Sequence, residues 1–220
     1  MRCRARTSRR ARRVPHDGSS PVGRSLVNAA RTLFGENGYA ATPVEDVVRL
    51  AGVTKGALYH HFADKVGLFR AVVEDVKGDV TTVVGAAFLE ASSEPDALDT
   101  VTRGCLAFIE AHRDPAVQRI TILDARSVLD AGTRRELDGR YEVAVIRGAL
   151  RRATRLGVID PQPLGPLAHV IAGALAEACA LLAEAGDEPE VREEIHTVVS
   201  RLLEGLRPRR LPPGDTTSTS

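Results

Sequence analysis

Apolar residues recur along the chain at intervals of three and four, and glycine, proline and serine interrupt the runs. This spacing is that of helices with one buried face. The pattern predicts an all-α chain of about nine helices. Their expected ranges are 22–37, 44–51, 55–62, 65–91, 95–112, 116–129, 134–156, 164–185 and 191–206.

Two short helices joined by a tight turn are expected between residues 44 and 62. Thr42 can cap the first helix, and Glu45 completes a capping box with it. Gly52 can adopt the backbone conformation that ends this helix, and Thr54 can cap the second. The order of capping and turn residues in this stretch therefore predicts a helix-turn-helix.

The second of these helices is expected to expose a cation, a glycine, an aromatic ring with a hydroxyl, and an imidazole. These residues are Lys55, Gly56, Tyr59 and His60. Together they make a surface suited to the phosphates and base edges of a DNA major groove. A helix-turn-helix also occurs as plain architecture in helical proteins, so periodicity alone leaves DNA binding open.

The two last helices carry more apolar surface than one subunit needs. The segment from Leu164 to Ala185 is apolar nearly all round, and the final helix has a clear apolar stripe. A helix that is apolar on every side must be covered on every side, so we expect a four-helix interface in a homodimer. The alternative is a monomeric core. The expected interface residues are Leu167, Ile171, Leu175, Ile195, Val199, Leu202 and Leu203.

Charge is distributed unevenly along the chain. The formal net charge is +1, yet Met1 to Arg13 holds seven arginines and no acid, which leaves 23 basic against 29 acidic residues in the remainder. Binding to DNA must therefore rest on a local surface. Residues 1–20 have too few apolar groups to order, and they are either an arginine arm that contacts DNA or a solvated tail.

The sequence holds little sign of catalysis or of metal binding. The three cysteines are too far apart for a zinc site, and their odd number argues against a disulfide framework. No glycine-rich phosphate loop, HExxH, GxSxG or CxxC motif is present. The neighbouring His60 and His61 point in different directions on a helix. We expect no enzyme, no cofactor, no metal and no membrane span, and a cytoplasmic location.

The run from Leu33 to Phe69, LFGENGYAATPVEDVVRLAGVTKGALYHHFADKVGLF, resembles the N-terminal DNA-binding domain of the tetracycline-repressor (TetR) family of transcriptional regulators. The features that carry the resemblance are the Phe-x-x-x-Gly-Tyr ending of the first helix, the Thr-Pro-Val-Glu opening of the second, and the Ala-Gly-Val-Thr-Lys-Gly-Ala-Leu-Tyr-His-His-Phe run. They are far more specific than a generic helix-turn-helix.

The resemblance implies a helix-turn-helix domain over residues 21–65 and a larger helical effector-binding and dimerisation domain over residues 66–206, followed by a disordered tail at 207–220. It also implies a homodimer that binds a palindromic operator in double-stranded DNA and is released by a small-molecule effector. The implied DNA contacts are Thr42, Thr54, Lys55, Gly56, Tyr59, His60 and Lys65.

The family also implies a cavity among the helices that correspond to residues 66–186. Polar residues that interrupt apolar faces there are candidate effector contacts: Cys105, Arg119, Asp124, His169 and Glu177. Each has an ordinary structural explanation, since a lone core histidine is usually hydrogen-bonded and a buried cysteine usually behaves as a small apolar residue.

Two other functions stay open from the sequence. One is a helical ligand-binding or interaction module whose helix-turn-helix no longer binds DNA, and the other is an enzyme that uses the C-terminal cavity. An activator is also compatible with the same features. The operator, the regulated genes and the effector are not encoded in any motif that we identify.

Overall fold

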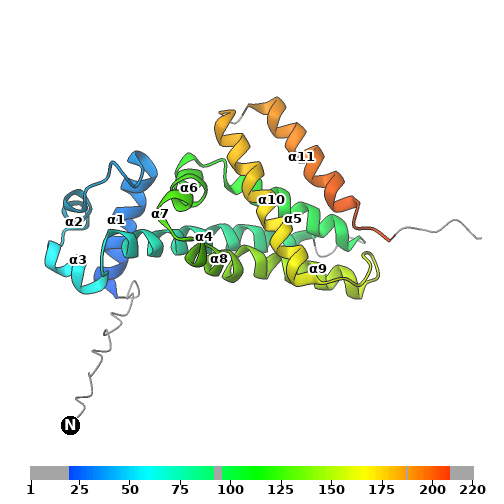
Figure 1. Ribbon diagram of the computed structural model, residues 1–220, viewed down its shortest axis with the longest axis horizontal. Helices are drawn as coiled ribbons and strands as arrows, with labels where there is room; N and C mark the ends of the chain where they lie inside the picture. Colours follow the sequence, from blue (N-terminus) through cyan, green and yellow to red (C-terminus); the bar gives the residue numbers. More distant parts are fainter. Residues whose placement is uncertain (1–19, 92–95, 187, 209–220) are drawn as a thin grey trace, which may run out of the picture. The chain divides into compact units, whose positions relative to one another are not determined.

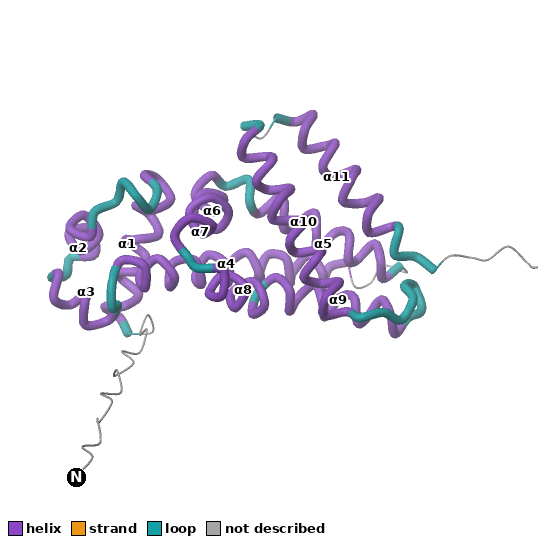
Figure 2. Tube along the Cα trace, in the orientation of Figure 1, coloured by secondary structure: helices purple, strands orange, loops and turns teal. Residues whose placement is uncertain are grey.

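The computed structural model describes residues 20–91, 96–186 and 188–208. Within these ranges the chain is helical and contains no strand (Figures 1 and 2). The helices form two compact units, one ending at Val72 and the other beginning at Val73. The all-α prediction is confirmed. Most of the two predicted tails, 1–20 and 207–220, lies outside the described residues.

The first unit contains α1 (Pro21–Asn37), α2 (Val44–Ala51), α3 (Lys55–His61) and the first turns of α4 (Lys65–Glu90). Ser20 caps α1 by accepting a hydrogen bond from the backbone of Gly23, and Gly38 follows the helix with φ of 82°. The three N-terminal helices pack on one another around a fully buried apolar core. Its largest members are Leu26, Phe34, Leu58, Phe62, Leu68 and Phe69.

The N-terminus of α2 differs from the predicted capping box. Pro43 occupies the capping position, and no side chain caps the helix. The hydroxyl of Thr42 instead donates to the backbone oxygens of Leu33 and Gly38, and Glu45 pairs with Lys55. Thr42 therefore ties the loop before α2 to the end of α1, because a buried hydroxyl is stabilised by whichever acceptors surround it.

The second unit continues α4 and adds α5 (Ala97–Ala111), α8 (Ala131–Arg140), α9 (Glu142–Arg155), α10 (Leu164–Glu184) and α11 (Pro189–Glu204). Between α5 and α8 the chain forms α6 (Pro115–Gln118), the π-helical turn η2 (Arg119–Asp124) and α7 (Ala125–Val128) without a gap. Helix α9 packs against α5 and α10, and α11 packs against α5 and α10 (Figure 1). Their inward faces form the apolar core of this unit.

One predicted helix is divided in two. The segment expected to run unbroken from 134 to 156 is interrupted at Tyr141, whose φ of −101° and ψ of −88° lie outside the helical region. Gly139 lowers the helix propensity just before the interruption. With α6, η2 and α7 counted as one, the described residues form ten helical segments.

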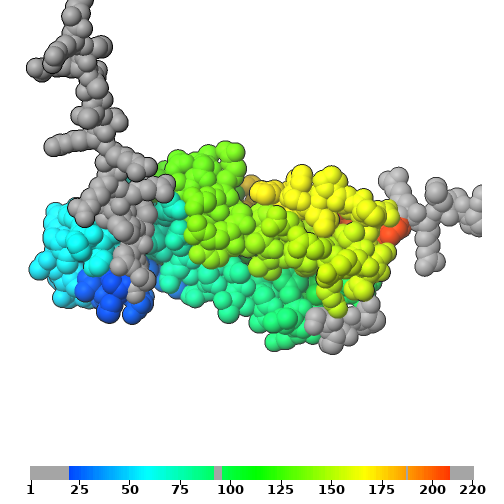
Figure 3. Space-filling view, turned by 90° about the horizontal axis from the view of Figure 1, so that it is seen from below, coloured from blue at the N-terminus to red at the C-terminus, as the bar shows by residue number. Residues whose placement is uncertain are grey.

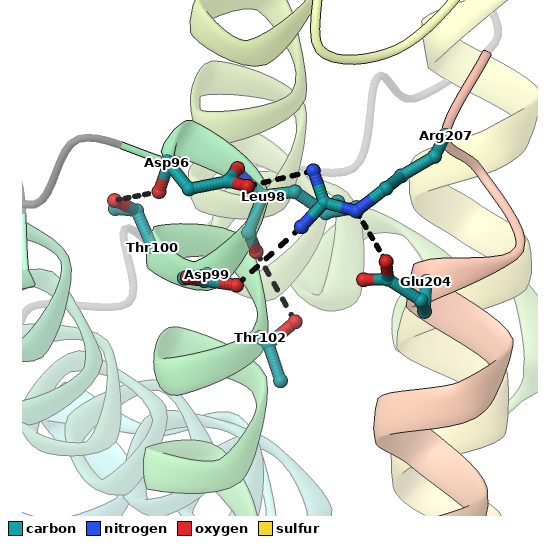
Figure 4. A network of polar contacts seen from close by, with 7 residues as sticks. All are labelled: Asp96, Leu98, Asp99, Thr100, Thr102, Glu204 and Arg207. Carbon is teal, nitrogen blue, oxygen red and sulfur yellow. Dashed lines mark hydrogen bonds and ion pairs between the residues drawn. The ribbon is translucent and has the colours of Figure 1, made fainter.

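Arg207 ties the end of α11 to the start of α5 (Figure 4). Its guanidinium lies 2.6 Å from a carboxylate oxygen of Asp96 and 3.6 Å from one of Asp99, and it also pairs with Glu204. Asp96 caps α5 through the backbone N–H of Leu98. Arg207 is the first residue of the expected C-terminal tail, and its side chain is held against the second unit by three carboxylates.

Helix α10 is long and apolar enough to cross a membrane by length and composition alone. One such helix is weak grounds for a membrane protein, since a helix that packs inside a soluble domain meets the same criteria. Here its inner face, including Ala168, Leu175 and Cys179, belongs to the core of the second unit.

Candidate functional sites

Helix α3 presents a polar outer surface on a buried apolar base. Thr54 caps the helix by accepting a hydrogen bond from the backbone N–H of Ala57, and Leu58 and Phe62 are fully buried beneath it. Tyr59 is 45% exposed, and His60 is also exposed. The buried base fixes the direction of the helix, so the tyrosine and the imidazole are available to a ligand outside the protein.

Lys55 and Gly56 complete this surface at the first turn of α3. Both are exposed, and a Cβ added to Gly56 would meet nothing closer than 3.8 Å. The ammonium of Lys55 pairs with Glu45 of α2 at 2.5 Å. The hydrogen bond from Lys55 lowers the pKa of Glu45, and the same contact raises the pKa of Lys55. Both groups are thus charged at neutral pH, and a phosphate would compete with Glu45 for this lysine.

Two of the predicted DNA contacts turn inward. Thr42 is only 1% exposed and its hydroxyl already donates to two backbone oxygens. Lys65 donates to the backbone oxygen of Tyr39, and its ammonium lies 4.1 Å from the centroid of the Tyr39 ring. These contacts give Lys65 a structural role, because hydrogen bonding and a cation–π interaction hold its charge against the domain. The buried hydroxyl of Thr42 is thus not open to a phosphate, whereas the phosphate contact expected of Lys65 stays a prediction.

The second unit contains a cavity of about 230 Å³ between α4, α5, η2, α7, α8, α9 and α10. Apolar side chains form much of its wall, but ionisable groups enter it from several helices. These are Lys77, His112, Arg134, Asp138 and Glu142, with Arg126, Arg135 and His169 on the exposed side. A mixed lining of this kind favours an amphipathic ligand over a hydrocarbon.

A buried ion pair forms part of the cavity wall. Lys77 of α4 lies 2.5 Å from Glu142 of α9 and 3.0 Å from Asp138 of α8, and Figure 3 shows the surface of α8 and α9 beside that of α4. Burial raises the pKa of Glu142, whereas for Lys77 the two carboxylates outweigh burial and raise the pKa. The second carboxylate oxygen of Glu142 is buried and accepts no hydrogen bond from the described residues.

His112 is a second buried polar group at the cavity. Its Nδ1 lies 2.7 Å from the backbone oxygen of Phe108, and the side chain packs against the Phe108 ring. A carbonyl oxygen only accepts, so Nδ1 carries the proton and Nε2 is left with a lone pair. Burial lowers the pKa of His112 to about 4. The ring is therefore neutral at pH 7 and acts at Nε2 as a hydrogen-bond acceptor.

Only one of the five predicted effector contacts lines the larger cavity. That residue is His169. Cys105 lines a much smaller void of about 10 Å³, and burial raises the pKa of its thiol to about 12. Arg119, Asp124 and Glu177 line neither space, and Glu177 pairs with Arg126 on the surface. Arg119 and Asp124 lie in the π-helical turn, which changes which side chains of that segment point inward.

The sequence did hold a signal for Lys77, a buried cation of the cavity that was not among the predicted contacts. Lys77 interrupts the apolar stripe formed by Val73, Val80 and Val84 at helical spacing. A single cation within such a stripe requires a buried acidic partner. We identified neither Lys77 nor its partner Glu142, because the partner lies 65 positions further along the chain.

The predicted dimer interface mixes inward and outward residues. Leu175, Val199 and Leu203 belong to the core of their own subunit, so their assignment to a subunit interface is wrong. Leu167, Ile171 and Ile195 are half-buried against the same core. Leu202 is 63% exposed, and other large apolar side chains on these two helices share its exposure. They are Val170, Leu181 and Val198.

Two family models match the chain. Residues 26–72 match "Bacterial regulatory proteins, tetR family", and residues 98–206 match "Tetracyclin repressor-like, C-terminal domain". A crystal structure of a TetR-family transcriptional regulator from Pectobacterium atrosepticum is 33% identical and superposes with a TM-score of 0.70. That likeness covers 84% of this chain and 93% of the other.

Curated relatives are similar over shorter segments. The A-factor receptor protein of Streptomyces griseus is 31% identical over 118 residues, which are 54% of this chain and 36% of that protein. The HTH-type transcriptional repressor KstR2 of Rhodococcus jostii is 36% identical over 92 residues, which are 39% of this chain and 45% of that protein. The chain thus spans less than half the length of the curated relatives it matches.

Proposed function

Because the chain belongs to the TetR family of transcriptional regulators, we propose that it is a DNA-binding repressor that acts as a homodimer and is released from its operator by a small molecule. The observation that carries this proposal is the outer surface of α3, where exposed Tyr59 and His60 stand on a fully buried apolar base. The relative from Rhodococcus jostii is itself a transcriptional repressor. A cytoplasmic location goes with this role.

The proposed DNA interface consists of Thr54, Lys55, Gly56, Tyr59 and His60. Lys55 supplies phosphate affinity after leaving Glu45, and Gly56 lets the helix approach the duplex closely. Tyr59 and His60 contact backbone or base edges from the exposed side of α3. The hydroxyl of Thr54 accepts the capping bond and keeps its proton for a phosphate oxygen.

The proposed dimer interface lies on the outer faces of α10 and α11. Val170 and Leu181 of α10 and Val198 and Leu202 of α11 are between 48% and 69% exposed. Large apolar side chains gathered in this way mark a surface that another chain covers. A two-fold dimer matches an operator made of two inverted half-sites, whose centres lie about one helical turn, roughly 34–36 Å, apart.

The proposed effector site is the cavity of the second unit. Helix α4 begins in the first unit at Lys65, and its later residues Val73 and Lys77 line the cavity. An effector that binds the cavity better in one position of α4 than in another shifts the protein toward that position, since only differential affinity moves such an equilibrium. Release follows if the favoured position binds the operator poorly.

Selection from random duplex DNA tests this function. Purified, folded protein is mixed with the pool at near-physiological salt, and the retained duplexes are sequenced. The proposal predicts an enriched inverted repeat with half-sites about one turn apart. A pool with no enriched motif contradicts it and favours an interaction module that no longer binds DNA.

A further inference from the structure

The cavity of the second unit is small for an organic ligand site. Its volume of about 230 Å³ lies below the roughly 300–1,000 Å³ of sites that take drug-sized molecules. A ligand that fills it is therefore compact.

Apolar side chains provide the surface for the body of such a ligand. Val73 comes from α4, Phe108 from α5, Ile122 from η2, Leu137 from α8 and Val143 from α9. On the side of α10 the lining residues are small, namely Ala172, Gly173 and Ala176. Phe108 is the one aromatic side chain of this described lining, and its ring stacks on His112, 4.2 Å away between centroids. Aliphatic groups thus match most of the wall.

Most cations of the lining already have acidic or carbonyl partners. Lys77 pairs with Asp138 and Glu142, Arg126 pairs with Glu177, and Arg135 donates to the backbone oxygen of Ala131. Arg134 differs: it lines the cavity, and its buried Nε has no hydrogen-bond acceptor among the described residues. Such a guanidinium is best satisfied by a planar carboxylate, which can accept two parallel hydrogen bonds.

Two other lining residues, His112 and Glu142, carry hydrogen-bond acceptors that lack donors, whereas Arg134 carries a donor that lacks an acceptor. His112 is 3% exposed and offers the Nε2 lone pair, to which no described residue donates. Glu142 lines the same cavity, and its second carboxylate oxygen also lacks a donor among the described residues. Acceptors left without donors in a buried site favour a ligand that brings its own O–H or N–H group.

Resting on the effector-released repressor proposed above, we propose that the effector is a compact aliphatic hydroxy acid. Its carboxylate pairs with Arg134, its hydrocarbon body lies against the apolar wall, and its hydroxyl donates to Nε2 of His112. A second carboxylate or a phosphate dianion fits less well, because Asp138 and Glu142 bring like charge into the same cavity.

Calorimetric titration of the full-length protein without DNA tests this inference. The probes share one ring: trans-4-hydroxycyclohexanecarboxylate, cyclohexanecarboxylate, the methyl ester of the hydroxy acid, cyclohexanol and cyclohexylamine, with inorganic phosphate as a further probe. Titration to about 10 mM covers the weak affinities expected of molecules this small. The hydroxy acid should bind tightest, the plain acid more weakly, and the ester and the alcohol at least about tenfold more weakly than the hydroxy acid.

Two variants locate the carboxylate. Arg134→Gln keeps a polar side chain and should weaken binding of the hydroxy acid about tenfold or more, while leaving cyclohexanol unchanged. Arg147→Gln removes the same charge from an exposed position on α9 that does not line the cavity, and it should have no effect. Circular dichroism of both variants checks that their helices are intact.

Several outcomes overturn the inference. They are equal binding of the acid and its ester, tightest binding of the amine or of phosphate, unchanged affinity in Arg134→Gln, and no binding by any probe. A protein that enriches an inverted repeat from random DNA yet gives one of these results keeps its proposed function and loses this effector class. A protein that binds the hydroxy acid through Arg134 but selects no DNA motif keeps this ligand class and loses the proposed function as a DNA-binding repressor.

Discussion

The pairing of Glu45 with Lys55 sets the charge that α3 offers to DNA. The two side chains join α2 to α3 at 2.5 Å, and each is more than half exposed. Because both are open to water, the pair contributes little to folding. Its consequence lies in binding, since a phosphate that approaches the ammonium of Lys55 meets the negative charge of Glu45 and competes with it.

Removing this competitor should strengthen DNA binding. In Glu45→Gln the lysine is free and a negative charge beside the duplex is lost, so we expect a modest rise in affinity for any duplex. Fluorescence anisotropy with labelled DNA at several salt concentrations measures it. Glu184→Gln makes the same change of net charge at an exposed position on α10. Equal affinities of the two variants would contradict a direct role for Glu45.

His112 should make the stability of the protein depend on acidity. Its pKa falls from 6.5 to about 4 on burial, so the unfolded chain binds a proton that the folded protein excludes between these values. Stability from this residue is complete above pH 6.5 and declines as the pH falls toward 4. The loss is roughly 2 kcal/mol by pH 5.

Chemical denaturation at pH 7 and pH 5 measures this effect. The free energy of unfolding of the wild-type protein should fall more between these two values than that of His112→Gln, which has no titrating ring. The difference between the two slopes isolates His112 from the other ionisable groups. Identical slopes would mean that His112 is protonated in the folded protein at pH 5.

At the scale of helices, α5 depends on a glycine to approach α4. A Cβ added to Gly104 would lie 2.1 Å from the ring of Phe88, whereas one added to Gly148 on α9 would meet nothing within 4 Å. Gly104→Ala should therefore destabilise the protein by about 1–3 kcal/mol through overpacking. Gly148→Ala should stabilise it by about 0.5–1 kcal/mol through helix propensity.

Thermal and urea unfolding of both variants compares them directly. Opposite signs are expected, and a stabilised Gly104→Ala would show that Phe88 leaves its place freely. The double variant with Phe88→Leu should recover part of the stability lost in Gly104→Ala, because the smaller side chain makes room for the new methyl group.

The sequence predicted helices well where their ends are set locally. Thr54 and Gly52 mark the turn before α3 in the sequence as they do in the structure. The sequence predicted helix ends wrongly where those ends depend on contacts with residues far along the chain. Thr42 satisfies its hydroxyl at α1 rather than capping α2, and the division at Tyr141 lies in a segment whose apolar spacing continues past it.

The same distinction explains the errors at the candidate sites. Helix α10 is apolar all round, so its sequence does not indicate which face is internal. On α11 two pairs of adjacent apolar residues occur, and the sequence does not indicate which residue of each pair is internal. Val198 and Leu202 point outward while Val199 and Leu203 enter the core. The cavity likewise joins Lys77 to Glu142 across 65 positions, which no local pattern encodes.

For the molecule as a whole, substitutions at two neighbouring leucines test the proposed dimer interface and the folding of the core separately. Leu202 is 63% exposed and Leu203 is 3% exposed. Leu202→Glu should leave the helical spectrum unchanged and convert dimers to monomers, because a charge in the centre of an interface stays unpaired. Leu203→Glu should unfold the protein by placing the same charge in the core. Light scattering after size exclusion gives the masses, and an unaltered mass for Leu202→Glu would place the interface elsewhere.

Binding of the operator by the outer surface of α3 is tested by the affinity of Tyr59→Ala for a duplex enriched by selection. Leu156→Ala is the matched control, because it removes an exposed side chain at the end of α9 in the other unit. We predict that Tyr59→Ala loses about tenfold or more in operator affinity with its dimer mass and helical content intact, and that Leu156→Ala binds like the wild type. Equal affinity of Tyr59→Ala and the wild type would contradict the account.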